Sequence, residues 1–235
     1  DGDQQRIYFL VARDGPLKNV KLCEEAADYL SQEWMFDVDG DMKIENYKFT
    51  RRPEALEAEI EVDDGVKKVF FLALHTKSKF INRGERLWSS KNAKDRNEYI
   101  VKSVKNRRRI AAECLRVRKC IDEILYKLED DPLIVVSGDM NDGPGTDFFE
   151  EYYLLFDSVE SLMGSPFQKK KMLTSLLISP EFVDPYDQWS CIFDDYVDNK
   201  KGKKVLLDHI FVSAALEHRI RGACIAHEVA DEHAL

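Results

Sequence analysis

The chain has 235 residues, of which 44% are hydrophobic, and its formal net charge is −9. The hydrophobic share excludes a disordered chain, and the acidic balance argues against a protein that wraps DNA through a dense basic surface. No run of about 18 apolar residues is present, so we expect no transmembrane segment. The length favours one α/β-sized domain over residues 1–235, with two small domains as the alternative.

The five cysteines form no Cys-x-x-Cys pair, and their number is odd. This pattern favours free thiols in a reducing compartment such as the cytoplasm, and it leaves secretion open. The first residues are acidic and polar, without the basic and apolar regions of a signal peptide, so we expect none within this chain.

The first third of the chain is predicted to alternate strands with one helix. Residues 6–13 predict a strand, and the apolar spacing of residues 20–36 predicts an amphipathic helix. Residues 55–62 and 68–79 predict a hairpin with an Asp-Asp-Gly turn. The second strand of this hairpin is apolar on both faces until His75, which predicts a central position in a sheet.

The rest of the chain is predicted to contain a long helix, further strands and loops. The predicted elements are a helix over residues 93–128, a strand over 133–137, a helix over 147–158, loops with short elements over 160–204, and strands over 204–213 and 219–230. Hairpin-linked strands with a long helix between later strands predict mixed or antiparallel sheets covered by helices.

Three of the apolar strands end in polar residues. Residues 70–74 lead to His75, residues 133–137 lead to the stretch GDMND that contains Asp139 and Asn141, and residues 205–207 lead to Asp208. A strand end holds the backbone fixed while polar side chains project into a cleft, as a metal-assisted hydrolase requires. Each motif alone also has a structural explanation, namely a turn, an exposed strand pair or a hydrogen-bonded histidine.

Together the three motifs resemble the endonuclease/exonuclease/phosphatase superfamily, which includes DNase I-like nucleases. The stretches LALHTKSK, VVSGDMNDGPGTD and LLDHIFVS are similar to the family patterns His-x-x-Ser, Gly-Asp-x-Asn and Leu-Asp-His/Tyr-x-Phe. The resemblance covers essentially the whole chain from Asp3 onward. It implies an α/β (α+β) fold, a four-layered sandwich of two mostly antiparallel sheets flanked by helices.

The resemblance also implies roles for individual residues. Asp139 would orient or deprotonate the attacking water, Asn141 would hold that water or a phosphoryl oxygen, and His75 would contact the scissile phosphate. Asp208 would support the metal site or its histidine, so the implied metal ligands are Asp139, Asn141 and Asp208. Oxygen donors of this kind suit Mg²⁺, with Mn²⁺ or Ca²⁺ as alternatives. We interpret Asp142 as part of the turn that caps the strand.

Basic residues near these motifs are candidates for substrate contacts. We expect Lys77, Ser78 and Arg51 to bind substrate, and the neighbouring Lys79 lies in a loop that could also reach it. The long helix over residues 93–128 has a strong excess of Lys and Arg over Asp and Glu. That excess is either a solvated helix face or a phosphate-backbone contact beside the cleft.

The chain departs from the family pattern in two places. The Asn and the Gln-Glu pair that precede the His strand in the family, and its final Ser-Asp-His, are not found. We therefore expect a domain that is incomplete at both ends, with the family's final His beyond Leu235. Gln32 and Glu33 end a helical pattern and are better explained as a solvated helix end, and Asp231 and His233 do not form Ser-Asp-His.

The leading interpretation is a metal-dependent phosphodiester hydrolase, most similar to a DNase I-like nuclease, acting on nucleic acid or another phosphodiester. The alternatives are a phosphoesterase of the same fold that acts on a small molecule or a lipid headgroup, and a non-catalytic scaffold. The Trp-Cys-Asp-Arg motif of the inositol-phosphatase branch does not precede Asp208, and no apolar hairpin for membrane insertion is evident. Oligomeric state, mode of cleavage and number of metal ions stay open.

Overall fold

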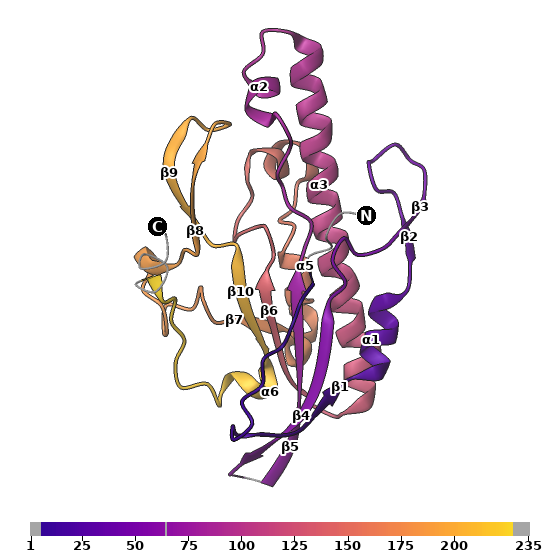
Figure 1. Ribbon diagram of the computed structural model, residues 1–235, viewed down its shortest axis with the longest axis vertical. Coiled ribbons are helices and arrows are strands. Elements are labelled where there is room, and N and C mark those ends of the chain that lie inside the picture. Colours follow the sequence, from indigo (N-terminus) through magenta and orange to yellow (C-terminus); the bar gives the residue numbers. More distant parts are fainter. Residues whose placement is uncertain (1–5, 64, 228–235) are drawn as a thin grey trace.

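A computed structural model describes residues 6–63 and 65–227, and a six-stranded mixed sheet is its main element (Figure 1). The strand order is β1-β4-β5-β6-β10-β7, and every neighbouring pair is antiparallel except β5 and β6. The strands are β1 (Leu17–Leu22), β4 (Glu54–Val62), β5 (Gly65–His75), β6 (Leu133–Asp139), β7 (Leu173–Ser175) and β10 (Asp208–Ser213). The predicted mixed α/β class and the central position of β5 are confirmed.

Two small sheets and several helices surround the large sheet. The small sheets pair β2 (Trp34–Phe36) with β3 (Glu45–Tyr47), and β8 (Cys191–Asp195) with β9 (Lys200–Val205). The helices are α1 (Glu24–Ser31), α2 (Gly84–Trp88), α3 (Ala93–Cys120), η1 (Ile121–Leu125), α4 (Tyr126–Leu128), η2 (Glu150–Leu154), α5 (Glu160–Met163), η3 (Pro166–Lys171), η4 (Pro185–Asp187) and α6 (Ala214–Glu217). Within the described residues, the large sheet is accompanied by these two-stranded pairs and not by a second large sheet.

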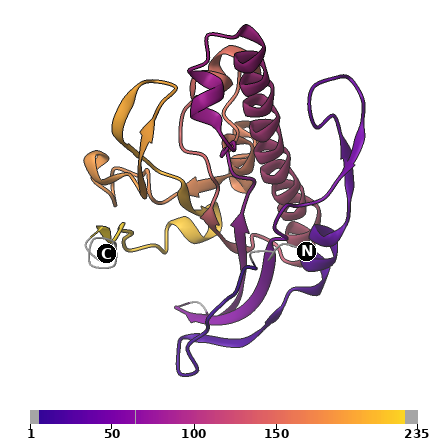
Figure 2. The ribbon, with the colours of Figure 1, turned by 45° about the horizontal axis from the view of Figure 1, so that its top comes forward.

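The core lies between one face of the large sheet and the long helix α3 (Figures 1 and 2). Alternate residues of β5 and β6 are buried there with Phe211 of β10, because successive side chains of a strand point to opposite faces. Ile110, Cys114 and Val117 supply the facing stripe of α3, and all three are 0% exposed. This packing fixes the strand ends relative to the helix. No helix in the described part of the chain has the length and apolarity needed to cross a membrane.

The N-terminal third differs from the prediction. Residues 6–16 form no strand, and Tyr8 and Leu10 are largely exposed. Residues 17–22, part of which was predicted to be helical, form the edge strand β1 and pair with β4. The backbone N–H of Cys23 donates to the carbonyl of Ala55 and extends this pairing to the start of α1. Pairing along an open sheet edge therefore overrides the helical spacing of the apolar residues, and α1 is shorter than predicted.

The hairpin and the long helix are confirmed. Strands β4 and β5 pair from Glu54↔Ala73 to Val62↔Gly65, and Asp64 of the expected turn lies outside the described residues. The helix predicted over residues 93–128 forms as α3, η1 and α4 in succession. The side chain of Asn92 caps its first turn by accepting a hydrogen bond from the backbone N–H of Lys94, at 2.9 Å.

The C-terminal half shows three further differences. The predicted helix over residues 147–158 is short and ends at Leu155, which has a left-handed φ of 65°. The predicted strand over residues 204–213 divides because Val205 pairs with Cys191, whereas Asp208 pairs with Asp139 of another sheet. Residues 219–227 form no strand. Asp231 and His233 lie outside the described residues.

The expected free thiols are found. All five cysteines are unpaired, and Cys23, Cys114 and Cys120 lie in the core. Burial raises the pKa of these three thiols, which keeps them in the uncharged form.

Candidate functional site

The ends of three neighbouring strands bring His75, Asp139 and Asp208 into one row. His75 is the register partner of Asp139 in the parallel pair β5–β6, and Asp139 is the partner of Asp208 in the antiparallel pair β6–β10. Paired residues of adjacent strands project from the same face of a sheet. The side chains of the sequence-adjacent Leu74 and His209 therefore point to the opposite face, where both residues are buried.

A glycine allows the two central strands to approach each other beside Asp139. Gly138 has φ of +135°, and a Cβ atom there would lie 1.9 Å from the carbonyl oxygen of Leu74. Only glycine tolerates both the backbone conformation and the close contact. The structure therefore requires glycine at position 138, whatever chemical role Asp139 has.

His75 and Asp139 are close enough to influence each other's charge. Nε2 of His75 lies 3.5 Å from Oδ2 of Asp139, and the other carboxylate oxygen, Oδ1, accepts a hydrogen bond from the backbone N–H of Asn141 at 2.8 Å. Burial and the nearby Arg51 lower the pKa of His75, and the charges of Asp139 and Asp208 oppose this shift. The imidazole is therefore neutral at neutral pH.

Asn141 and Arg51 meet at the backbone carbonyl of Thr76, immediately after His75. The side-chain nitrogen Nδ2 of Asn141 donates to this oxygen at 3.1 Å, and Nη1 of Arg51 donates to it at 2.9 Å. Asn141 adopts a left-handed backbone conformation with φ of 53°, which asparagine accepts more readily than most residues. The two side chains are thereby held at the end of β5.

Lys77 adds positive charge on the same side of the site. Burial lowers its pKa, as do the charges of Arg109 and Arg51, while Glu113 opposes the shift. Its backbone N–H donates to Oε2 of Glu113 at 2.8 Å. Three basic side chains, Arg51, Lys77 and Arg109, therefore influence one small region beside His75, and an anion there would relieve their mutual repulsion.

Glu113 is an internal anchor of the site that the sequence did not suggest. It is 0% exposed, and besides Lys77 it binds the Tyr47 hydroxyl at 2.8 Å and the backbone N–H of Thr50 at 3.1 Å. It joins the segment before Arg51 to the loop after His75. In the sequence it stands among the basic residues of a long helix, so only its contacts identify it.

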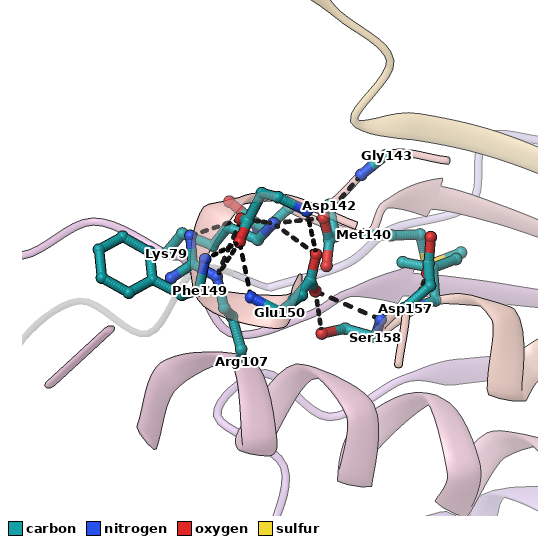
Figure 3. Close-up of polar contacts among 12 residues, drawn as sticks. Lys79, Arg107, Met140, Asp142, Gly143, Phe149, Glu150, Asp157 and Ser158 are labelled. Atoms are coloured by element: carbon teal, nitrogen blue, oxygen red, sulfur yellow. Dashed lines mark hydrogen bonds and ion pairs between the residues drawn. The ribbon is translucent and has the colours of Figure 1, made fainter. Parts of the chain in front are cut away.

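A second, buried network joins Lys79, Arg107, Asp142 and Glu150 (Figure 3). Lys79 extends inward and binds the carboxylates of Asp142 and Asp147, the latter at 2.8 Å. Arg107 of α3 also binds Asp147, with Nη2 at 2.5 Å. Lys79 therefore does not lie free to contact substrate. Asp142, which we expected only to cap the strand, is 3% exposed and anchors the loop.

Glu150 completes this network. Its carboxylate accepts hydrogen bonds from the backbone N–H of Asp147 at 3.0 Å and from the Ser158 hydroxyl. Asp147 in turn accepts from the backbone N–H groups of Phe149 and Glu150, which is a reciprocal cap of the short helix. Burial and the adjacent Asp142 raise the pKa of Glu150 to about 7, although Lys79 opposes the shift.

The basic residues of α3 mostly serve the interior. Arg107 binds Asp147, Arg108 donates to the carbonyl of Asp37 at 2.5 Å, and Arg118 binds Asp122. Arg116 lies over the ring of Tyr29 at 3.8 Å. Many of the basic side chains in this helix are thus bound to carboxylates, backbone carbonyls and aromatic rings of the protein itself.

The structure also shows where Ser78, Gln32 and Glu33 lie. Oγ of Ser78 accepts a hydrogen bond from the backbone N–H of Phe80 at 3.1 Å, and Ser78 lines a cavity together with Asn141. Gln32 and Glu33 are exposed at the end of α1, as expected of a solvated helix end. The sequence therefore identified side chains that come together around the end of β5, apart from Lys79.

The donors at the strand ends suit a hard divalent cation. Asp139 and Asp208 offer two carboxylates at adjacent strand positions, and Asn141 offers an amide beside them. Mg²⁺ takes oxygen ligands, needs one or two carboxylates, and keeps several of its waters. In the described part of the chain, the acidic trio of Asp142, Asp147 and Glu150 also has ligand-like spacing, but the ammonium group of Lys79 is bound there.

Comparison with known proteins gives matches among solved structures. No protein-family model matches the chain, and no curated protein matches it. The matched structures include TDP2 from Caenorhabditis elegans, with 14% identity over 84% of this chain and 41% of that chain and a TM-score of 0.36. They also include beta toxin from Staphylococcus aureus, with 17% identity over 71% of this chain and 45% of that chain and a TM-score of 0.34.

A third matched structure is an endonuclease/exonuclease/phosphatase family protein from Bacteroides thetaiotaomicron. It has 13% identity over 83% of this chain and 50% of that chain, with a TM-score of 0.33. Its family is the superfamily that the sequence motifs resemble. The chain spans about half the length of the solved structures it matches.

Proposed function

We propose that the chain is a metal-dependent phosphodiester hydrolase. The observation that carries this proposal is the row of His75, Asp139 and Asp208 on one sheet face, with Arg51 and Lys77 beside it. Hydrolysis of a phosphodiester needs an activated water and neutralisation of charge on the phosphoryl oxygens. A carboxylate, a neutral imidazole and a group of cations meet both needs within one site.

Each residue has a role that its contacts support. Asp139 accepts a proton from the attacking water, and its carboxylate is oriented by the backbone N–H of Asn141. His75, neutral at neutral pH, donates a hydrogen bond to a phosphoryl oxygen, while Arg51 and Lys77 balance the phosphate charge. Asp139, Asn141 and Asp208 would hold Mg²⁺, or Mn²⁺ or Ca²⁺ in its place, which supplies Lewis-acid stabilisation when bound.

We further propose that the substrate is a nucleic acid. His75, Arg51 and Lys77 would bind one phosphate of this polyanion. The α3 arginines are engaged internally, so the protein would contact the nucleic acid mainly at the strand-end site. A small-molecule or lipid-headgroup phosphoester would place the same demands on the same residues. The two classes of substrate therefore have to be separated by experiment.

The experiment compares substrates under one set of conditions. The protein is incubated with plasmid DNA and with bis(p-nitrophenyl) phosphate, in Mg²⁺ or Mn²⁺, and then with EDTA. If the protein cleaves both the DNA and the small ester, and EDTA abolishes both reactions, the result supports a nuclease. Hydrolysis of the small ester without cleavage of DNA supports a phosphoesterase for smaller substrates. Absence of any hydrolysis, together with no divalent-cation binding in the low-millimolar range, contradicts the proposal and favours a non-catalytic scaffold.

A further inference from the structure

A cavity of about 530 Å³ adjoins the strand-end site. Ser78 and Asn141 form one part of its wall, together with Leu207, the residue before Asp208. The rest of the wall comes from the hairpin β8–β9, from the segment around Phe148 and Phe149, from α3 and from the loop after β5. Figures 1 and 2 show the hairpin opposite α2 and the adjoining part of α3. The cavity is within the size range of small-molecule sites.

Aromatic side chains form most of the wall away from the strand ends. The lining rings are Tyr99, Phe148, Phe149, Phe193 and Tyr196, together with the exposed Phe80. Three of them support one another, since the ring centroids of Tyr99 and Phe149 lie 5.6 Å apart and the hydroxyl oxygens of Tyr99 and Tyr196 lie 3.0 Å apart. Phe193 is 41% exposed, whereas Tyr99 and Phe149 are buried. The wall is therefore preformed and offers an open ring for stacking.

The cations that line the cavity are already paired. The ammonium group of Lys203 binds Asp195 at 2.7 Å and Asp198 at 3.0 Å. Lys79 and Arg107 both bind Asp147. Each of these three lining cations is thus satisfied by carboxylates. With the phosphate at the strand ends, the cavity is suited to an uncharged, flat group joined to that phosphate.

We infer that the cavity binds a nucleobase of the substrate, stacked against Phe193. The inference rests on the proposed phosphodiester hydrolysis and specifies its substrate class as an ester of a nucleoside. A nucleobase combines a planar apolar face with N–H donors at its edge. The carboxylate of Asp194, which accepts from the backbone N–H of Gly202 at 2.9 Å, stands in the lining as an acceptor for such donors.

The test uses three diesters with the same p-nitrophenolate leaving group, so that differences report the other ester group. These are thymidine 5′-p-nitrophenyl phosphate, benzyl p-nitrophenyl phosphate and methyl p-nitrophenyl phosphate. We expect kcat/KM for the thymidine ester to exceed that for the methyl ester by about tenfold or more, the effect of stacking one base. The substitution Phe193→Ala should lower kcat/KM for the thymidine ester at least about fivefold more than for the methyl ester. Phe167→Ala, at a ring that is 96% exposed in η3, is the control and should change neither.

The outcomes separate this inference from the proposed function. Equal kcat/KM for the thymidine and methyl esters, or a preference that survives Phe193→Ala, overturns the inference while hydrolysis itself stands. A benzyl ester as good as the thymidine ester overturns the assignment to a nucleobase. If none of the three esters is hydrolysed in any divalent metal, the proposed function fails. Binding of thymidine alone, measured by saturation-transfer NMR, then decides the inference, which requires a signal that Phe193→Ala removes.

Discussion

His75 and Asp139 occupy paired positions on the parallel strands β5 and β6, with Nε2 of the imidazole 3.5 Å from Oδ2 of the carboxylate. Asp139 favours a charged imidazole, but burial and the charge of Arg51 favour a neutral one, and together they prevail. The imidazole beside Asp139 is therefore neutral at neutral pH. This is the charge state that the proposed roles of the two residues require.

The charge of Arg51 can be tested through the titration of His75. We expect the pKa of His75 to lie below 6.5 and to rise in Arg51→Gln, because a nearby positive charge disfavours the imidazolium. Arg51→Lys keeps the charge and should keep the pKa low. The measurement is an NMR titration of the histidine ring protons, with His75→Gln identifying the resonance. A pKa that is unchanged in Arg51→Gln would show that Arg51 does not act on His75.

Lys79 is predicted to stabilise the fold rather than to bind substrate. In Lys79→Met, the buried Asp142 and the adjacent Asp147 lose a cation, and removal of one partner of a buried ion pair costs about 3–5 kcal/mol. Lys43→Met removes an exposed ion pair with Asp41 that solvent screens, and it should leave the free energy of unfolding nearly unchanged. Urea denaturation measures both free energies of unfolding. Equal losses in the two variants would contradict the structural role of Lys79.

Glu150 should make the stability depend on pH. Its pKa is about 7 in the folded protein, above the ordinary value of 4.5, because of burial and Asp142; Lys79 opposes the shift, and Asp147 donates a backbone hydrogen bond. A raised pKa means that the folded state holds the proton more tightly. This contribution is present below pH 4.5 and is lost as the pH rises through about 7.

Glu150→Gln keeps a neutral amide in place of the protonated carboxyl. Between pH 5 and pH 8, the wild-type protein should therefore lose more stability than Glu150→Gln does. Chemical denaturation at the two pH values gives the comparison, and the other titrating groups, including His75, His209 and Asp157, contribute to both proteins. Identical changes in the two proteins would mean that Glu150 titrates near its ordinary value.

Gly138 is predicted to be irreplaceable. In Gly138→Ala the new Cβ would meet the carbonyl oxygen of Leu74 at 1.9 Å with φ of +135°, so β5 and β6 would have to separate. We expect a loss above about 4 kcal/mol, or failure to fold. Gly145→Ala, also at positive φ but with no atom within 4 Å of the added Cβ, should cost about 1–2 kcal/mol. Thermal unfolding compares the two, and similar losses would contradict the close approach at Gly138.

The centre of the sheet and the strand ends could be predicted because short stretches of the sequence determine them. The apolar run before His75 and the abrupt change at Asp139 predict buried strands with polar ends, and the register of β5, β6 and β10 then aligns those ends. The edge strand β1 was missed because its conformation depends on pairing with β4, about 40 residues away in Lys18↔Glu59.

The internal anchors could not be predicted, because their partners are distant in the sequence. Glu113 binds Lys77, and Lys79 binds Asp142 and Asp147, across separations of 36, 63 and 68 residues. In the sequence, a buried glutamate in a basic helix and a lysine in a polar loop look like solvated residues. Only the packing of α3 against the ends of β5 and β6 shows that both are interior.

We propose above that the protein hydrolyses phosphodiesters with a divalent metal at the row of His75, Asp139 and Asp208. The most direct measurement is the rate of bis(p-nitrophenyl) phosphate hydrolysis against Mg²⁺ concentration for the wild-type protein, Asp139→Asn and Asp28→Asn. Asp28 is exposed on α1 and serves as the matched control. We predict metal-dependent hydrolysis that falls at least about a hundredfold in Asp139→Asn and is unchanged in Asp28→Asn, with equal circular dichroism for all three. Hydrolysis by Asp139→Asn at the wild-type rate, or activity that does not respond to metal or EDTA, would contradict the account.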